Sequence, residues 1–424
     1  MARRITLYIL LAMILGIIVG FVINRTISDP TVIVTITDGF SILTGLFLKL
    51  IKMIIAPLVF ATLVGGIAHM SDRSALGRLG VRAIGWFLLA SVTSLTLGLI
   101  FVNLLQPGVG VGLSLPDSHA ASGVAHAKFV LKDFILDLVP SSIIDAMAKN
   151  AILQIVIFSV FAGIAASAMG EKAAPLIKGV DALAQLMLQI TDYVMRAAPF
   201  AVFAAVASAV AKEGLGILLT FGYFMGGFYL ALVALWSLLF GATALAIGPR
   251  RAKSLFLHIR EPFLIGFSTA SSEAAFPRTL EALEKFGVPP QIAGFVLPLG
   301  YSFNLDGSMM YCSFATMFIA QAYGIHLSFA QQGMMLLLLM VTSKGIASVP
   351  RASLVVISST LGFFHIPESG LLLILAVDQF LDMGRTGTNV VGNAVAATLV
   401  AKWEGTLGET KKDGEPSAES VIAV

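Results

Sequence analysis

The sequence has little charge and a single cysteine, and both shortages limit what the chain can be. Of its 424 residues, 12% are charged and 57% are hydrophobic, whereas a soluble domain carries about 25% charged residues. Cys312 stands alone, so it forms no internal disulfide and is interpreted as a small hydrophobic residue. The sequence contains no HExxH, CxxC or phosphate-binding loop, so no cofactor is expected. Basic clusters interleaved with aromatic residues are also missing, which argues against nucleic-acid binding.

Long apolar runs occupy most of the chain. A membrane-spanning helix needs about 20 apolar residues, and no small-x-small cleavage site follows the first run, so we expect a retained helix there. The pattern predicts an all-α polytopic membrane protein with eight transmembrane helices, near residues 5–24, 39–68, 84–106, 149–170, 178–211, 215–247, 290–324 and 369–402.

Lysine and arginine in the short loops predict the orientation. Placing the N-terminus in the cytoplasm puts most loop cations inside, as the positive-inside rule requires. Both termini are then cytoplasmic. The hydrophilic residues 403–424 are expected to form a disordered cytoplasmic tail.

Two further apolar segments, 255–283 and 329–363, are too interrupted for a single spanning helix. Their centres, STASSEAAFP at 268–277 and TSKGIASVPR at 342–351, look like copies of each other. Each is expected to be a re-entrant helical hairpin that enters the membrane and leaves on the same side. Because the two enter from opposite sides, they form inverted repeats, which are typical of secondary transporters.

A polar stripe follows one face of the last apolar run, DMGRTGTNVVGN at 382–393 with Asp378 upstream. At about 100° per residue, the stripe covers a sector of about 100°, with Gln379 and Thr388 outside it. Mutual pairing of the acids with Arg385 would make it structural, but intramembrane ionisable residues usually serve function. The stripe consists of Asp378, Asp382, Arg385, Thr386, Asn389 and Asn393.

A second polar cluster lies in the preceding run, LPLGYSFNLDGSMMYC at 297–312. Pro298, Gly300 and Gly307 weaken the helix around it. An unwound stretch exposes carbonyl oxygens, and Asp306 adds charge, so the pattern favours a cation site. A kinked helix with a satisfied aspartate is the structural alternative.

These residues resemble the glutamate transporter family, the dicarboxylate/amino acid:cation symporters, over about residues 5–402. The resemblance is carried by TASSEAAFP at 269–277, NLDGS at 304–308, VPRAS at 349–353 and DMGRTGTN at 382–389. It implies a homotrimer in a bacterial inner membrane and an elevator-type mechanism. Scaffold helices would come from residues 1–70 and 141–212. The transport domain would come from 71–140, which includes an external loop, and from 213–402.

The resemblance also implies roles for individual residues. Arg385 would bind the side-chain carboxylate of the substrate and Asp382 its amino group. The implied substrate-binding residues are Ser271, Ser272, Ser308, Ser348, Val349, Asp382, Arg385, Thr386 and Asn389. The implied coupling-cation residues are Ser91, Gly300, Ser302, Asn304, Asp306, Ser343, Asp378, Asn389 and Asn393.

Some positions depart from the sodium-coupled pattern. Asn393 stands where those members carry an aspartate, and Phe87 and Ala90 replace a tyrosine and a threonine. Glu273, beside the serines of the first hairpin, is the candidate proton carrier. Lys344 and Arg351 in the second hairpin are expected to face the surface, and a gating or anion-binding role is the alternative.

The leading hypothesis is a symporter that imports glutamate or aspartate with protons, sodium ions or both. A C4-dicarboxylate symporter is the alternative. Asp382 argues against it, because a buried carboxylate needs a cationic partner such as an ammonium group, which succinate lacks. An ion channel would not need Arg385 opposite acids. An intramembrane enzyme needs a nucleophile with a base in reach, and the hairpin serines have no nearby histidine in sequence. The expected partners are a small acidic substrate and the lipid bilayer.

Overall fold

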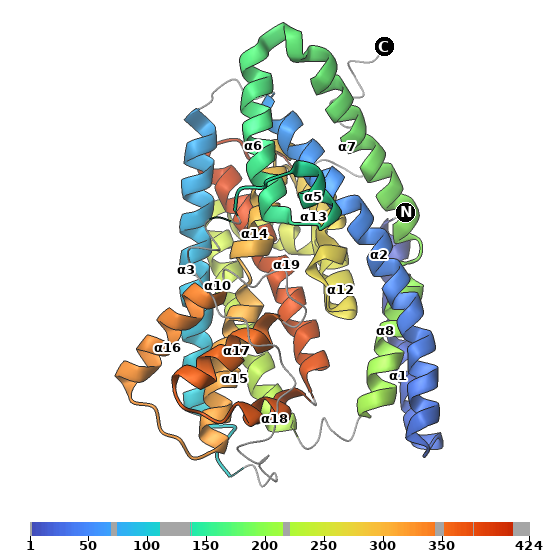
Figure 1. Ribbon diagram of the computed structural model, residues 1–424, viewed down its shortest axis with the longest axis vertical. Coiled ribbons are helices and arrows are strands. Elements are labelled where there is room, and N and C mark those ends of the chain that lie inside the picture. Colours follow the sequence, from blue (N-terminus) through green and yellow to red (C-terminus); the bar gives the residue numbers. More distant parts are fainter. Residues whose placement is uncertain are drawn as a thin grey trace.

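Helices and their connections make up all of the chain that the structure describes. A computed structural model describes residues 2–68, 74–110, 136, 138–214, 221–343, 352–375 and 377–409, and it has no strand within these ranges (Figure 1). This agrees with the predicted all-α class. The elements are α1 (Ala2–Thr26), α2 (Pro30–Ala68), α3 (Ser74–Leu105), α5 (Ile143–Ala148), α6 (Ile152–Met169), η1 (Gly170–Ala173), α7 (Ala174–Met195), α8 (Ala198–Glu213), α10 (Gly222–Ile247), α11 (Pro249–His258), α12 (Arg260–Thr269), α13 (Ser272–Phe286), α14 (Pro290–Phe303), α15 (Asp306–Ala322), α16 (Phe329–Thr342), α17 (Ala352–Phe363), η3 (Glu368–Gly370), α18 (Leu371–Leu375) and α19 (Asp378–Trp403).

Five stretches of the described chain are long and apolar enough to cross a membrane. They are Leu7–Thr26, Pro30–Ala68, Gly77–Leu105, Ile152–Met195 and Gly222–Ile247. Other runs that the sequence predicts as spans are interrupted: the run at 290–324 divides into α14 and α15, and the run at 178–211 divides into α7 and α8. Pro199 lies in the first turn of α8, where a proline is compatible with a helix start but not with a continuous helix.

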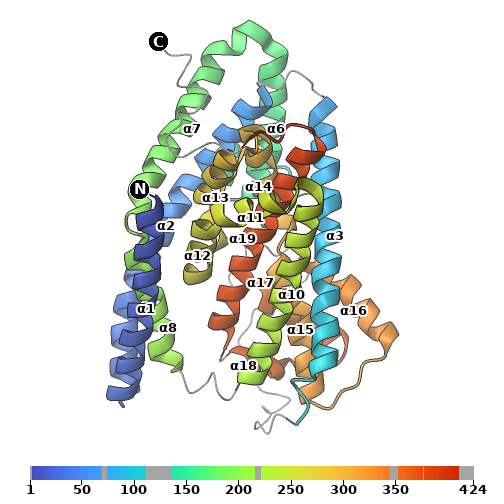
Figure 2. The same cartoon turned by 180° about the vertical axis from the view of Figure 1, so that it is seen from behind.

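An outer group consists of helices α1, α2, α6, α7 and α8. Helices α1, α2, α7 and α8 lie along one side of the molecule, and α6 packs against α2 near one end (Figures 1 and 2). Glycines allow the closest approach within this group. A Cβ atom added to Gly16 would lie 2.9 Å from the carbonyl oxygen of Phe203 on α8, and one added to Gly20 would lie 2.6 Å from that of Ala207. These two glycines of α1 therefore serve helix packing within the chain.

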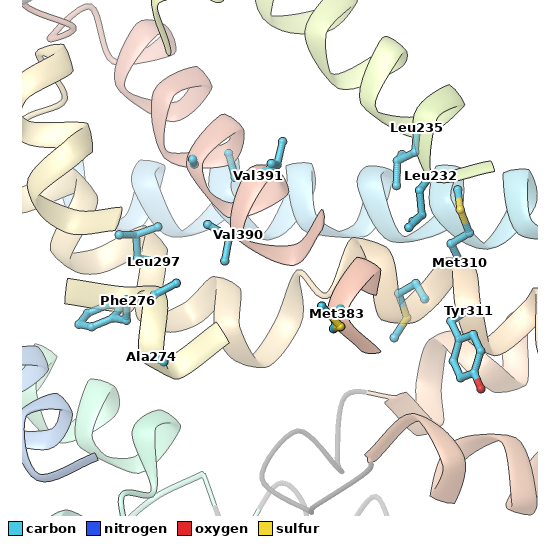
Figure 3. Packing of buried hydrophobic residues seen from close by; sticks show 14 of the residues in the cluster. Leu232, Leu235, Ala274, Phe276, Leu297, Met310, Tyr311, Met383, Val390 and Val391 are labelled. Carbon is cyan, nitrogen blue, oxygen red and sulfur yellow. The ribbon is translucent and has the colours of Figure 1, made fainter. Parts of the chain in front are cut away.

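The last helix, α19, is the centre of the inner group, which includes α3, α10 and α12 to α15. Every residue from Met383 to Ala401 is buried. Apolar side chains of the neighbouring elements surround this stretch, among them Phe276 of α13, Leu297 of α14 and Met310 of α15 (Figure 3). The strongly polar face of α19 is thus enclosed by protein.

Helices α12 and α13 form a hairpin. Ala270 has a left-handed backbone with φ of 50°, and the Ser271 hydroxyl accepts a hydrogen bond from the Ala274 amide at 3.3 Å, which caps α13. A Cβ atom added to Gly266 would lie 3.6 Å from the Cβ of Ala275, so the two arms run back along each other.

Helices α16 and α17 pack against each other, but residues 344–351 between them lie outside the described part of the chain. Lys344, Ser348, Val349 and Arg351 are among these residues. The α12–α13 pair has its base near the end of α19, where Gly287 bonds Gly408. The α16–α17 pair leads through η3 and α18 to the start of α19. The two pairs therefore approach the middle of α19 from opposite ends (Figure 1).

The first residues of the expected tail differ from the prediction of disorder. Trp403 ends α19, and the segment Glu404–Glu409, which we name the C-terminal strap, contacts α3 and the residue that follows α13. The Glu404 side chain is 8% exposed and lies 2.6 Å from Arg82 and 3.7 Å from Arg78, both on α3. At the other end of the strap, the Gly408 amide donates to the Gly287 carbonyl at 2.9 Å.

We expect the strap to contribute measurably to stability. Deleting residues 404–424 removes the Glu404 carboxylate beside two arginines and the Gly408–Gly287 bond, so the apparent Tm should fall. Because both arginines are partly exposed, each of these ion pairs is worth about 1 kcal/mol or less. Deleting only residues 410–424 should leave Tm unchanged, and Glu404→Gln should lower it. Equal Tm values for the two deletions in a detergent melting assay would contradict a stabilising strap.

Candidate functional site

Arg385 is a fully enclosed cation with two acids beside it. Its side chain is 2% exposed, and its Nη2 atom lies 3.1 Å from Asp378 Oδ1 and 2.9 Å from Asp382 Oδ1. The Nε atom also donates to Asp382 Oδ1, at 3.2 Å. The Nη1 atom is buried and has no hydrogen bond to the described residues. Arg385 thus keeps the Nη1 donor available, while two carboxylates balance the charge of its guanidinium group.

Asp382 keeps one oxygen available in the same way. Its contacts with Arg385 and with the Thr386 hydroxyl, at 3.4 Å, all use Oδ1. Among the described residues, Oδ2 has no hydrogen-bond donor, and the side chain is 32% exposed. An unused guanidinium nitrogen and an unused carboxylate oxygen therefore come from two residues one helical turn apart.

Tyr311 of α15 supports the charged pair from one side. Its ring lies 4.2 Å from the guanidinium carbon of Arg385, and its hydroxyl donates to Asp378 Oδ1 at 3.3 Å. A cation over an aromatic face is stabilised by the ring quadrupole, most strongly where water is excluded. Tyr311 was not among the residues predicted from the sequence. Its position one turn after Ser308, on the same face of α15, could have indicated it.

Asn389 joins the polar stripe to the start of α15. Its Oδ1 accepts from the Gly307 amide at 2.9 Å and the Ser308 amide at 3.4 Å, and its Nδ2 donates to the Ser308 hydroxyl at 3.2 Å. A Cβ atom on Gly307 would collide with the backbone of Arg385. Glycine is therefore required for α15 to approach α19 this closely.

A second buried cluster lies where α14 ends and α15 begins. The Asn304 side-chain amide donates to Asp306 Oδ2 at 3.4 Å and to Asn393 Oδ1 at 3.3 Å. All three side chains are 0% exposed. Asn304 Oδ1 and Asn393 Nδ2 are buried without a hydrogen-bond partner in the described residues. Such a group of hard oxygens around one carboxylate is suited to a small cation.

The structure brings many of the predicted site residues together, but not all. The predicted substrate residues form two hydrogen-bonded groups on neighbouring turns of α19: Asp382 with Arg385 and Thr386, and Asn389 with Ser308. Among the predicted cation residues, Asn304, Asp306 and Asn393 form the second cluster. Gly300 adjoins it, because the Gly300 carbonyl accepts a hydrogen bond from the backbone amide of Asn304 at 2.7 Å.

For the other predicted residues the structure gives the local position. Ser271 caps α13, and neither it nor Ser272 has a hydrogen bond to the polar stripe within the described chain. Ser91 is buried on α3 and Ser302 on α14, and the Ser343 hydroxyl donates to the Met340 carbonyl at 3.1 Å.

Glu273 faces the outer group of helices. Its carboxylate lies 3.4 Å from Lys52 of α2, and its side chain is 44% exposed. No contact between Glu273 and the polar stripe is present in the described residues.

A buried charged stripe, broken helices around it and apolar helices outside define a polytopic helical membrane transport protein. Comparison with known sequences gives the particular kind: residues 5–403 match the sodium:dicarboxylate symporter family, and the chain belongs to this family. The family is one of symporters, so the chain is a transport protein and not an enzyme.

Individual relatives cover almost the whole chain. It is 38% identical over 411 residues to the proton/sodium-glutamate symport protein of Bacillus subtilis (strain 168), covering 96% of this chain and 94% of the relative. It is 39% identical over 361 residues to the proton/glutamate-aspartate symporter of the same organism, covering 84% and 87%. It is also 39% identical over 385 residues to C4-dicarboxylate transport protein 2 of Mesorhizobium japonicum, covering 89% and 86%.

We expect Gly392→Ala to destabilise the second cluster. The new Cβ atom would collide with the Asp306 carboxylate and lie 3.4 Å from Asn304 Nδ2. Overpacking of this kind costs about 1–3 kcal/mol, so the apparent Tm should fall. Gly241→Ala on α10 is the matched control because nothing lies within 4 Å of its Cβ position. Similar Tm values for the two variants would show that the cluster has room for a methyl group.

Proposed function

We propose that the protein is a secondary active symporter that imports glutamate or aspartate together with protons, sodium ions or both. The observation that carries the proposal is a pair of atoms, Arg385 Nη1 and Asp382 Oδ2, that have no hydrogen-bond partner among the described residues. An acidic amino acid presents a side-chain carboxylate and an ammonium, which match these atoms in charge. Arginine suits a carboxylate because its planar fork donates two parallel hydrogen bonds.

Uptake of C4-dicarboxylates is the second candidate, because relatives with that name are as similar to this chain as the glutamate symporters are. Arg385 serves a dicarboxylate equally well. Asp382 does not, since its available oxygen would meet a second carboxylate without an ammonium to neutralise it. This difference favours an amino acid as substrate.

The proposal includes the architecture that the resemblance implies. The eight apolar runs are transmembrane helices, α12–α13 and α16–α17 are re-entrant hairpins related as inverted repeats, and both termini are cytoplasmic in a bacterial inner membrane. The approach of the two pairs toward the middle of α19 from opposite ends supports this arrangement.

An elevator mechanism in a homotrimer completes the architecture. Residues 1–70 and 141–212 form the scaffold, and residues 71–140 and 213–402 form the transport domain. Two ion pairs then cross between the parts, Lys52 with Glu273 at 3.4 Å and Asp192 with Arg278 at 2.8 Å. A sliding transport domain has to exchange these contacts for water or for new partners.

Coupling is assigned to two places. The cluster of Asn304, Asp306 and Asn393, with the Gly300 carbonyl, supplies oxygens for a sodium ion, and rotation of the Asn304 amide would add its unpartnered Oδ1. Glu273 is the proposed proton carrier. Its partner Lys52 belongs to the scaffold, so translocation separates the carboxylate from its countercharge.

Substrate preference tests the site directly. Asp382→Asn should weaken aspartate binding far more than succinate binding, because only the amino acid uses an ammonium contact. One charge-assisted hydrogen bond is worth about 1.5–3 kcal/mol, or roughly 10- to 150-fold in affinity. Calorimetric titration of the purified protein measures both ligands.

Arg385→Ala is the companion variant and should lose both ligands, since both need the guanidinium. Equal losses of aspartate and succinate in Asp382→Asn would assign Asp382 a structural role. Tight succinate binding by the unmodified protein would favour the C4-dicarboxylate candidate instead.

Uptake into proteoliposomes tests transport and its coupling. We expect an inward proton gradient to drive glutamate uptake without sodium, because Asn393 and Ala90 remove a charge and a hydroxyl from the sodium-coupled pattern. Glu273→Gln should abolish the response to the pH gradient while leaving substrate binding within about twofold. Strict dependence on sodium with no response to pH would contradict proton coupling and leave the oxygens around Asn304 as the coupling site.

A further inference from the structure

The face of α19 opposite the polar stripe packs against α10, outside the site described so far (Figure 2). Taking Asp378 as zero and about 100° per residue, the stripe spans about −20° to 80°. The opposite face is centred at about 230°. Of its residues, Phe380, Gly384 and Thr388 contact α10, and Gly387 contacts Phe263 of α12.

Tyr229 of α10 holds the first turns of α19. Its hydroxyl donates to the Phe380 carbonyl at 2.6 Å. Its ring lies on the backbone at Gly384, where an added Cβ atom would come within 2.9 Å of Tyr229 Cε1. The bonded carbonyl is two residues from Asp382, so the contact acts on the turn that carries the substrate groups.

Trp236 repeats the contact two turns further along α10. Its indole nitrogen donates to the Thr388 hydroxyl at 3.0 Å, and that hydroxyl donates to the Gly384 carbonyl at 2.9 Å. Its ring also packs edge-on against Phe263 of α12, with centroids 5.0 Å apart. Phe263 in turn fills the space beside Gly387.

We propose that Tyr229 and Trp236 are positioning residues that fix the rotation of α19 about its own axis. Every residue from Met383 to Ala401 is buried, so apolar burial gives this helix little preference for one rotation over another. Interhelical hydrogen bonds and small residues that let helices approach closely then decide the packing of membrane helices. The α10 contact supplies both.

The rotation sets substrate selectivity, and this part of the inference rests on the proposed function. Asp382 lies at about 40° and Arg385 at about 340°, on either side of the centre of the stripe. A rotation of α19 brings one of them toward the ligand and moves the other away. An amino acid uses both groups, whereas a dicarboxylate has no ammonium for Asp382, so the ratio of the two affinities reports the rotation.

The test uses Tyr229→Phe and Trp236→Phe in the full-length protein, each of which removes one hydrogen-bond donor and keeps a ring. Binding of L-aspartate, and of succinate in competition with it, is measured for each variant. We expect aspartate affinity to fall about 3- to 20-fold, the range of one interhelical hydrogen bond in a membrane protein. The aspartate-to-succinate ratio should change at least about threefold.

Tyr223→Phe is the matched control. Tyr223 lies on the same helix and donates to a backbone carbonyl at 2.7 Å, but that carbonyl belongs to Leu105 of α3. This variant should keep both affinities within about twofold of the unmodified protein. Unchanged affinities in Tyr229→Phe and Trp236→Phe would overturn the proposal, as would a uniform loss that Tyr223→Phe shares.

Hydrogen exchange separates this outcome from failure of the proposed function. If the unmodified protein binds neither ligand, the proposed function fails, but the contact can still be measured without a ligand. Tyr229→Phe should then speed amide exchange across residues 378–388 relative to Tyr223→Phe, because the Phe380 carbonyl loses its interhelical donor. Equal exchange in the two variants would overturn the positioning role by itself.

Discussion

The enclosed guanidinium of Arg385 is the constraint that the rest of the site satisfies. An arginine at the centre of a membrane helix is penalised by about 2.5–3.5 kcal/mol on insertion scales. Asp378 and Asp382 neutralise it within 3.1 Å and 2.9 Å, and the Tyr311 ring covers one face. Two acids and one base leave the stripe with net negative charge, so a cationic group completes the balance. A substrate ammonium or a coupling cation is such a group.

Backbone proximity is the second constraint, and glycine provides it. Gly307 lets α15 reach the backbone of α19 beside Arg385, and Gly392 lets the Asp306 carboxylate lie against α19. The same approach places Asn389 within hydrogen-bond distance of the Gly307 and Ser308 amides. These are the first amides of α15, which have no partner within their own helix. The break between α14 and α15 therefore supplies donors that the polar stripe uses.

Periodicity and helix chemistry predicted a large part of this arrangement. The stripe followed from the spacing of Asp382, Arg385 and Asn389, because an apolar helix tolerates strongly polar groups only on the face that protein or water covers. Pro298 and Gly300 indicated weakness of the helix before Asn304, and α14 ends at Phe303. The turn at Ala270 and Ser271 followed from the polar interruption of an apolar segment.

Contacts between distant segments were not predictable from the sequence in the same way. The hydrophilic composition after residue 402 indicated disorder, since nothing local shows that Glu404 meets Arg82, which is distant in sequence. Tyr311 and Tyr229 are ordinary aromatic residues in apolar helices, and only the fold places their hydroxyl groups on α19. Glu273 was expected on the strength of its neighbours Ser271 and Ser272, yet its partner is Lys52 of another helix.

The two carboxylate oxygens of Asp382 have different contacts, and this difference links the structure of the site to its substrate selectivity. Oδ1 takes the contacts from Arg385 and Thr386, so the arginine stays neutralised whether or not a ligand is present. Within the described part of the chain, Oδ2 and Arg385 Nη1 have no hydrogen bond that would have to break before a ligand binds. Preorganisation of this kind lowers the free-energy cost of ordering on binding. Because the α10 contact holds the opposite face of the same helix turns, we infer that this preorganisation depends on Tyr229 as well as on the charged residues.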